Sequence, residues 1–357
     1  MRRHTFLLAI SSAACLLSAT ASAQSTARPL PTFRLSTPIS AVTANFPSTA
    51  TATTADPSAA GILSASAPLG DTDAAWSPVA VQDTSGTTEF SSLKVTAEAR
   101  SSANFREVSG SLDTQRAGLD ATIGRNFSGN RAVALHIANE SSFYKFGNGS
   151  TLVPSVSAPF NDLFRTSAGI QVAIQADEHF SWLAGAEVSI SGEDLVGLTD
   201  SMIFGGLGGI RYRISEDVAF TFGLAGESRL AAEAWVMPFF GMEWEMSDKT
   251  SFKVQGSELR LEHQITEHIL ASCGARYDVR QYRLNGSNPV ANGVFRDEEI
   301  RVTVGLDWRF SEEATLGLEL GQVMWNEFTV LNAAGGLVGE TEADPAPYIG
   351  LSLRFGM

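Results

Sequence analysis

Five short acidic segments divide much of this sequence into runs in which apolar and polar residues alternate. They lie at 177–179, 215–217, 247–249, 266–268 and 311–313, and each is three residues long. A period of two is typical of β-strands with one apolar face, and a three-residue loop joins neighbouring antiparallel strands. The sequence therefore favours antiparallel hairpins whose strands have one apolar and one polar face.

The turns also predict which residues face each other. A three-residue loop places residues of the same face opposite each other across the hairpin. We expect facing pairs on the apolar side between Ile174 and Trp182, Tyr212 and Phe220, Trp244 and Phe252, and Trp308 and Leu316. On the polar side of one of these hairpins, we expect Glu243 to face Lys253.

Fourteen alternating runs follow residue 90, and most have the roughly 9 to 11 residues with which a tilted strand crosses a membrane. They lie near 91–101, 114–126, 131–140, 166–176, 180–190, 202–214, 218–228, 233–246, 250–256, 258–265, 269–283, 297–310, 314–328 and 347–356. If the two short runs at 250–256 and 258–265 do not form a hairpin, the count is twelve. The predicted fold is an all-β, transmembrane, up-and-down antiparallel barrel, because every second residue faces the apolar side.

The connections between these runs differ at the two ends. Long ones fall near 102–113, 141–165, 191–201, 284–296 and 329–346, all opposite the short turns. In bacterial outer-membrane barrels the short turns are periplasmic and the long loops extracellular, which predicts that both chain ends lie in the periplasm. Outside the expected signal at residues 1–23, no stretch has the roughly 18 consecutive apolar residues of a membrane helix.

Aromatic residues gather near the strand ends, as expected for girdles at the two membrane interfaces. The predicted girdle beside the short turns consists of Phe180, Trp182, Tyr212, Phe220, Phe222, Trp244, Phe252, Trp308 and Phe310. The predicted girdle at the opposite end consists of Phe143, Tyr144, Trp235, Tyr282, Trp325 and Tyr348.

The N-terminal region differs in character from the strands. Residues 1–23 read as a secretory signal, with a basic start, an apolar stretch at 5–17 and an A-x-A cleavage site before Gln24. A lipidated Cys15 is the alternative, although the residues before it lack the usual large aliphatic residue. Residues 24–90 are rich in Ala, Ser, Thr and Pro without periodicity, which predicts a flexible periplasmic segment. Its rival is a plug inside the barrel.

Three details refine the predicted barrel of residues 91–357. In the last strand, Ile349, Leu351, Leu353 and Phe355 are expected to face lipid. The alternation changes phase in 314–328, which predicts a bulge near Gly321. Cys273 alternates with alanines on the apolar face, so we expect it to face lipid too.

Charged residues of the other parity are the candidates for a functional lumen. They are Arg211, Arg213, Glu243, Glu245, Lys253, Arg260, Glu262, Arg276, Asp278, Arg280, Arg301, Asp307, Arg309 and Glu319. Such mixed charges suit either a wet passage or a lumen filled by ion pairs, because about fourteen strands lie between filled and open barrels. The sequence alone does not decide between an open and a filled lumen.

The composition limits the classes of molecule that the protein is expected to bind. The formal net charge is −14, so there is no basic stripe for nucleic acid. The expected partners are outer-membrane lipid, lipopolysaccharide and the barrel-assembly machinery, with the oligomeric state open. No His/Cys cluster has metal-ligand spacing, and the sequence predicts no cofactor.

Two short patterns raise catalysis as an alternative. They are His179-Phe180-Ser181, and His136 followed by Asn139 and Ser141. The first lacks a third partner, and the second mixes the two faces of a strand. We therefore expect no catalytic residues, while an outer-membrane enzyme acting on lipid stays as a further alternative.

The second half of the chain resembles an uncharacterised family of bacterial outer-membrane barrel proteins, a domain of unknown function. The resemblance extends from residue 165 to the terminal strand, and its clearest parts are AGI at 168–170, LAGAEV at 183–188, PFFGMEW at 238–244 and YDVRQYRL at 277–284. It implies a fold and a location but no functional residues. A passive pore or transport channel is the first hypothesis, and a closed structural or surface-binding barrel is its rival.

The two ends of the chain are expected to respond differently to deletion. Deleting residues 24–89 behind the intact signal should leave a barrel whose electrophoretic mobility changes on heating, because this segment has no strand edge to complete. Removing residues 348–357 should abolish assembly, since the closing strand is lost. If both deletions are equally damaging, the N-terminal segment is a plug or an additional strand.

Overall fold

The computed structural model describes residues 88–127, 130–147, 149–160, 162–193 and 198–356. The expected signal and nearly all of the segment before residue 90 lie outside this part. The described chain forms β1 (Thr88–Asn104), β2 (Ser111–Phe127), β3 (Arg131–Gly147), β4 (Asp162–Gln175), β5 (Phe180–Gly192), the 3-10 helix η1 (Leu198–Ser201), β6 (Met202–Arg213), β7 (Val218–Glu227), β8 (Trp235–Ser247), β9 (Thr250–Gln255), β10 (Glu258–Thr266), β11 (Ile269–Arg283), β12 (Val294–Arg309), β13 (Ala314–Leu331), β14 (Leu337–Ala343) and β15 (Ala346–Gly356).

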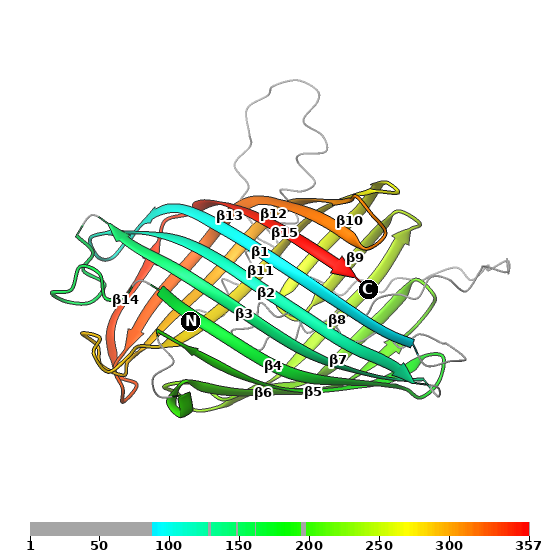
Figure 1. Ribbon diagram of the computed structural model, residues 1–357, viewed down its shortest axis with the longest axis horizontal. Helices are drawn as coiled ribbons and strands as arrows, with labels where there is room; N and C mark the ends of the chain where they lie inside the picture. Colours follow the sequence, from blue (N-terminus) through cyan, green and yellow to red (C-terminus); the bar gives the residue numbers. More distant parts are fainter. Residues whose placement is uncertain (1–87, 128–129, 148, 161, 194–197, 357) are drawn as a thin grey trace, which may run out of the picture. The chain divides into compact units, whose positions relative to one another are not determined.

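These strands form a closed antiparallel barrel (Figure 1). Each strand from β1 to β13 pairs with the next, and β15 pairs with both β13 and β1. Because β14 and β15 pair with successive parts of β13, they occupy one position in the wall, which therefore has fourteen strands as the sequence predicts. None of the described helices is long and apolar enough to cross a membrane.

The short β9–β10 hairpin forms, so the twelve-strand alternative is wrong. Its two central residues are Gly256 and Ser257, and Gly256 has a φ of 56°. A positive φ at the first central position is characteristic of tight two-residue hairpins and suits glycine, which has no Cβ.

All four predicted apolar pairs are direct cross-strand partners. Ile174 faces Trp182, Tyr212 faces Phe220, Trp244 faces Phe252 and Trp308 faces Leu316. Glu243 also faces Lys253, as predicted. A shift of one residue would have moved these charges to the apolar side, so the turns determine the inside and outside of the barrel.

The outer face of the barrel carries the apolar residues. Trp182, Phe222 and Trp308 of the girdle beside the short turns are exposed there. Ile349 and Leu351 are exposed on β15, in agreement with the predicted orientation of the last strand. These exposed side chains match the lipid-facing band of an outer-membrane barrel.

The predicted second girdle is wrong for three of its tyrosines. Tyr144, Tyr282 and Tyr348 face the lumen and are buried. Their hydroxyl groups donate hydrogen bonds to lumen carboxylates, namely Tyr144 to Asp297, Tyr282 to Glu140 and Tyr348 to Glu319. A tyrosine near a strand end thus belongs to the lumen when its parity and a buried acceptor place it there. Trp235 also has the inward parity, whereas Phe143 and Trp325 face outward.

The bulge in β13 lies at Met324, three residues beyond its predicted position. Arg301 pairs with Val323 and Ile300 pairs with Trp325, so Met324 is the extra residue. Val323 consequently stays inside and is buried, while Trp325 returns to the outer face. The connections are also shorter than expected, since the region 329–346 contains β14.

The wall overlaps itself beside the short β9–β10 hairpin. β8 pairs with β9 only up to Gly241, and β11 pairs with β10 only up to Arg276. Beyond these residues, toward the long loops, β11 meets β5 through a bridge between Arg283 and Gly192. Leu230, from the β7–β8 connection, packs with the outward-facing Val294 of β12. The outer face of β11 and β12 is therefore covered by protein at this end.

The parity of β11 can be tested by cysteine labelling. Cys273 has the outward parity, so an aqueous maleimide should label it slowly when the purified protein is in lipid vesicles. The variant Ser272→Cys with Cys273→Ala should be labelled quickly, because residue 272 has the inward parity. Equal rates at the two positions would contradict the assigned faces.

Candidate functional site

The lumen has two parts that differ in their access to water. Toward the short turns, inward-facing charged side chains keep contact with solvent, with side-chain exposures of 27% for Lys253, 34% for Arg260 and 23% for Asp307. Toward the long loops, the exposures fall to 2% for Arg301 and 0% for Glu299. One barrel thus combines a wet half near the short turns with a dry half near the long loops.

The charges of the wet half form ion pairs in which Lys253, Arg260 and Asp307 stay partly accessible, although the side chain of Arg211 is buried. Arg211 lies 3.1 Å from Glu243, and Lys253 lies 2.7 Å from Glu262. Arg260 approaches Glu262 at 3.1 Å. Ion pairs that remain in contact with water contribute little to stability.

The dry half contains a continuous network of buried charges, which we call the ion-pair layer. Glu299 of β12 is at its centre. Its carboxylate lies 3.0 Å from Arg116, 3.1 Å from Arg280, 3.4 Å from Arg301 and 3.5 Å from Arg100. The network extends to Asp297, Glu98, Asp278 and Glu140, and at its boundary with the wet half to Arg276, whose side chain is 28% exposed. Five arginines and five acids therefore balance each other.

Polar side chains hold the ion-pair layer in place. Asn326 donates to Asp297 at 2.6 Å, and the hydroxyl of Tyr144 donates to the same carboxylate group at 2.9 Å. Arg100 donates to Thr114 at 2.8 Å. Taking charges out of water costs several kcal/mol per ion, and only such dense pairing and hydrogen bonding offsets that cost.

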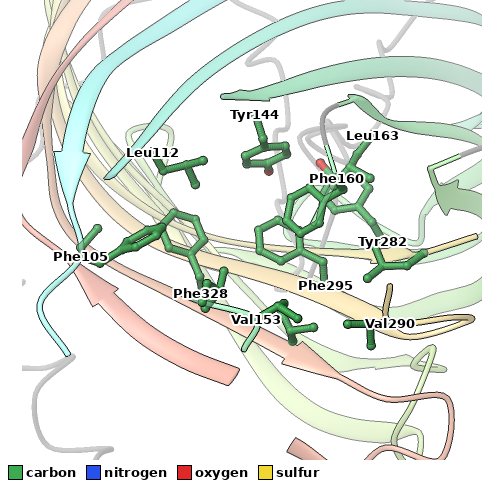
Figure 2. Close-up of a cluster of buried hydrophobic side chains, with 14 of the residues drawn as sticks. Phe105, Leu112, Tyr144, Val153, Phe160, Leu163, Tyr282, Val290, Phe295 and Phe328 are labelled. Carbon is green, nitrogen blue, oxygen red and sulfur yellow. The ribbon is translucent and has the colours of Figure 1, made fainter. Parts of the chain in front are cut away.

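An aromatic plug lies next to the ion-pair layer, at the end of the barrel with the long loops (Figure 2). Phe295 is its centre, with ring centroids 4.2 Å from Phe160, 5.2 Å from Tyr144 and 5.9 Å from Phe328. Leu112 and Leu163 belong to the same buried cluster. The plug therefore joins β2, β3 and β4 to β12 and β13 across the lumen.

The connections at this end pack onto the plug. Leu152 and Val153 from the β3–β4 connection, and Val290 from the β11–β12 connection, are buried in it. Arg106 donates to Glu342 at 3.0 Å and to Asp344 at 3.1 Å, which joins the β1–β2 connection to β14. Although desolvation opposes it, hydrogen bonds from the Glu342 backbone and the Thr341 hydroxyl hold the pKa of Glu107 below its usual value.

Fewer strands surround the lumen in the dry half than in the wet half. Where β11 meets β5, the ring of neighbouring strands reduces to β11–β14 and β1–β5. A ring of nine strands is close to the eight-strand barrels whose interiors are filled by side chains, whereas fourteen strands leave more room. The dry half thus follows from the short β9–β10 hairpin and the overlap that it permits.

The charged candidates from the sequence all have the inward parity, but the structure divides them between the two halves. Arg276, Asp278, Arg280 and Arg301 belong to the ion-pair layer. The wet half contains Arg211, Arg213, Glu243, Glu245, Lys253, Arg260, Glu262, Asp307, Arg309 and Glu319. The sequence does not distinguish these groups, because both have the same alternation.

Sequence reasoning missed much of the ion-pair layer. Arg100, Arg116 and Glu140 lie on β1 to β3, where the turns are not of the three-residue acidic type. Asp297 and Glu299 were within a predicted strand but adjoin Glu298 and Arg296, which have the opposite parity. Continuing the parity of Asp307 along β12 would have identified both.

The two patterns that raised catalysis are not assembled into a site. His136 faces the lumen and lies 2.7 Å from Asp120, whereas Asn139 and Ser141 have the outward parity. The ring of His179 contacts the backbone carbonyl of Arg213 at 3.0 Å. Among the residues that the structure describes, no group of three or more His, Cys, Asp or Glu side chains suits a metal ion.

The closed antiparallel wall and its apolar outer face define the class of the fold, a β-barrel of the outer-membrane type. No protein-family model matches the sequence, and no curated protein matches it. Among solved structures, the chain is similar to the KdgM porin, with 8% identity, a TM-score of 0.33, and coverage of 74% of this chain and 98% of that chain. It is also similar to the Pseudomonas putida toluene transporter TodX, with 11% identity, a TM-score of 0.38, and coverage of 76% and 90%.

A third similar structure is the COG4313 outer membrane channel from Pseudomonas putida F1. The identity is 9%, the TM-score is 0.40, and the coverage is 77% of this chain and 97% of that chain. With TM-scores of 0.33, 0.38 and 0.40, these three likenesses carry no conclusion about this chain.

The ion-pair layer should depend strongly on its central acid. Glu299→Gln leaves four buried arginines facing a neutral side chain, so we expect the free energy of unfolding to fall by about 3 to 5 kcal/mol. Urea unfolding of the refolded protein in lipid vesicles measures this change. The control Glu312→Gln alters an exposed turn and should stay within about 0.5 kcal/mol of the wild type. Similar losses in both variants would contradict the central role of Glu299.

Proposed function

We propose that this protein is a passive outer-membrane channel, with a water-filled half on the periplasmic side and a side-chain gate on the extracellular side. The observation that carries the proposal is the contrast in the exposure of the lumen charges. Arg260 and Lys253 keep about a third of their side-chain surface in contact with water inside the wall, at 34% and 27%. If the lumen were only a packed structural core, its charged side chains would not need to remain in contact with water.

The gate consists of the ion-pair layer and the aromatic plug. Both close the lumen by contacts between β1–β4 and β11–β13, as in the pairs Arg116–Asp297 and Tyr144–Phe295. Because these contacts join opposite walls through side chains, passage requires only that side chains and loops move. The backbone ladder of the barrel stays intact, which matters because unpaired backbone groups are costly in lipid.

The second candidate is a closed structural or surface-binding barrel. The complete burial of Glu299 and Phe295 favours it, because a densely packed interior resembles the filled lumen of small barrels. Under this hypothesis the extracellular connections bind a partner, and no solute passes through the lumen.

The orientation and the partners are part of the proposal. The short turns are periplasmic and the long connections extracellular, which leaves both chain ends in the periplasm after removal of the signal. The lipid-facing belt contacts outer-membrane lipid and lipopolysaccharide, and the terminal strand is recognised by the barrel-assembly machinery.

Single-channel recording in planar lipid bilayers distinguishes the two functions. For the wild type we expect small and infrequent current steps, because the gate is closed at rest. The variant Phe160→Ala with Phe295→Ala removes the centre of the aromatic plug and should give larger and more frequent steps. Phe143→Ala, which removes an outward-facing ring, should behave as the wild type.

Electrical silence of the wild type and of the plug variant at high protein load would favour the closed barrel. Heat-modifiable migration of each variant in electrophoresis provides the check that it has folded.

A further inference from the structure

Cations gather on one side of the wet half, near the short turns. Lys94 of β1 is the cross-strand partner of Arg354 of β15. On its other side, Arg354 pairs with Thr315 of β13. Thr315 in turn pairs with Arg309 of β12. All four residues have the inward parity. Arg354 and Arg309 are exposed to the lumen, and Lys94 is half-buried.

The direct pairing of Lys94 with Arg354 is unfavourable for the fold. Residues directly opposite each other on one face of an antiparallel pair have Cβ atoms about 4.5 to 5.5 Å apart, and like charges in these positions repel. Arg276 adds to the repulsion on Lys94 from a third strand, whereas Asp120 and Glu98 attract it.

The nearest acids do not neutralise these cations by direct contact. Asp120, the cross-strand neighbour of Lys94 on β2, lies 2.7 Å from His136. Asp307, the next inward residue before Arg309, lies 3.5 Å from Arg260. Within the described residues, no ion pair within 4.0 Å involves Lys94, Arg309 or Arg354. Arg309 and Arg354 are therefore accessible to lumen water, whereas Lys94 is half-buried.

We propose that Lys94, Arg309 and Arg354, with the hydroxyl of Thr315 between them, form a binding site for small anions that carry carboxylate or phosphate groups. Guanidinium and ammonium groups donate strong, charge-assisted hydrogen bonds to such oxygens. An anion at this place also removes the repulsion between Lys94 and Arg354. The inference deepens the proposed channel function and rests on it, since the site lies on the periplasmic part of the route.

Calorimetric titration with citrate at low ionic strength tests the site directly. We expect the folded wild-type protein in detergent to bind citrate, with an affinity that falls as KCl is added, because salt screens exposed charges. The double variant Lys94→Gln with Arg354→Gln should bind at least about tenfold more weakly, since it loses two charge-assisted contacts. Inorganic phosphate, titrated in the same way, shows whether a single anionic group suffices.

The control is Lys249→Gln, which removes one positive charge from the exposed β8–β9 turn. It should bind citrate as the wild type does. Equal affinities of the double variant and the control, or no binding by the wild type at low salt, would overturn the site. The site and the channel fail in different ways: calorimetric binding without any current in bilayers keeps the site and rejects the channel, whereas current without binding does the reverse.

Discussion

The structure depends first on the hydrogen bonds of its backbone. In the hydrocarbon of a membrane no water can satisfy an unpaired N–H or C=O group, so a sheet there has to close on itself. The pairing of β1 with β15 completes this closure, over a register that runs from Ser92 with Gly356 to Arg100 with Tyr348. Once the ring is closed, the alternation along each strand separates lipid-facing from lumen-facing residues, and most of the strand charges lie inside.

The enclosed charges then have two different environments. In the half near the short turns they remain wet, and pairs such as Lys253–Glu262 keep part of their surface accessible. In the other half they are buried, and Glu299 is neutralised by four surrounding arginines. A buried ion is destabilising unless all its partners are present, so the ion-pair layer depends on each of its members. The wet half, by contrast, contains the like-charged pair of Lys94 and Arg354.

The difference between the halves originates in the wall. A short hairpin, β9–β10, ends below its neighbours, which allows the end of β11 to reach β5 and the β7–β8 connection to cover the outer face of β12. The narrower ring brings aromatic side chains from opposite walls into contact, as Phe295 and Phe160 show. The proposed gate consists of side chains on a closed backbone, so its opening would not expose polar backbone groups to lipid.

The sequence by itself determined the number of strand positions in the wall, and the faces and registers of the hairpins at the three-residue turns. The three-residue turns were sufficient to place Trp244 opposite Phe252 and Glu243 opposite Lys253, because the period of a strand leaves only two choices of face. The sequence also predicted the outward parity of Cys273 and the orientation of the last strand. These properties are local, since they depend on a strand and its immediate turn.

Only the tertiary structure decided which lumen charges are buried and which are wet. Arg301 and Arg260 have the same parity and chemistry, yet one belongs to the ion-pair layer and the other to the wet half. Likewise, Tyr144 and Tyr282 are part of the plug and not of a membrane girdle. The physical reason is that burial inside a barrel depends on the distance across the ring, which is determined by how distant strands such as β5 and β11 meet, and alternation along one strand carries no information about that distance.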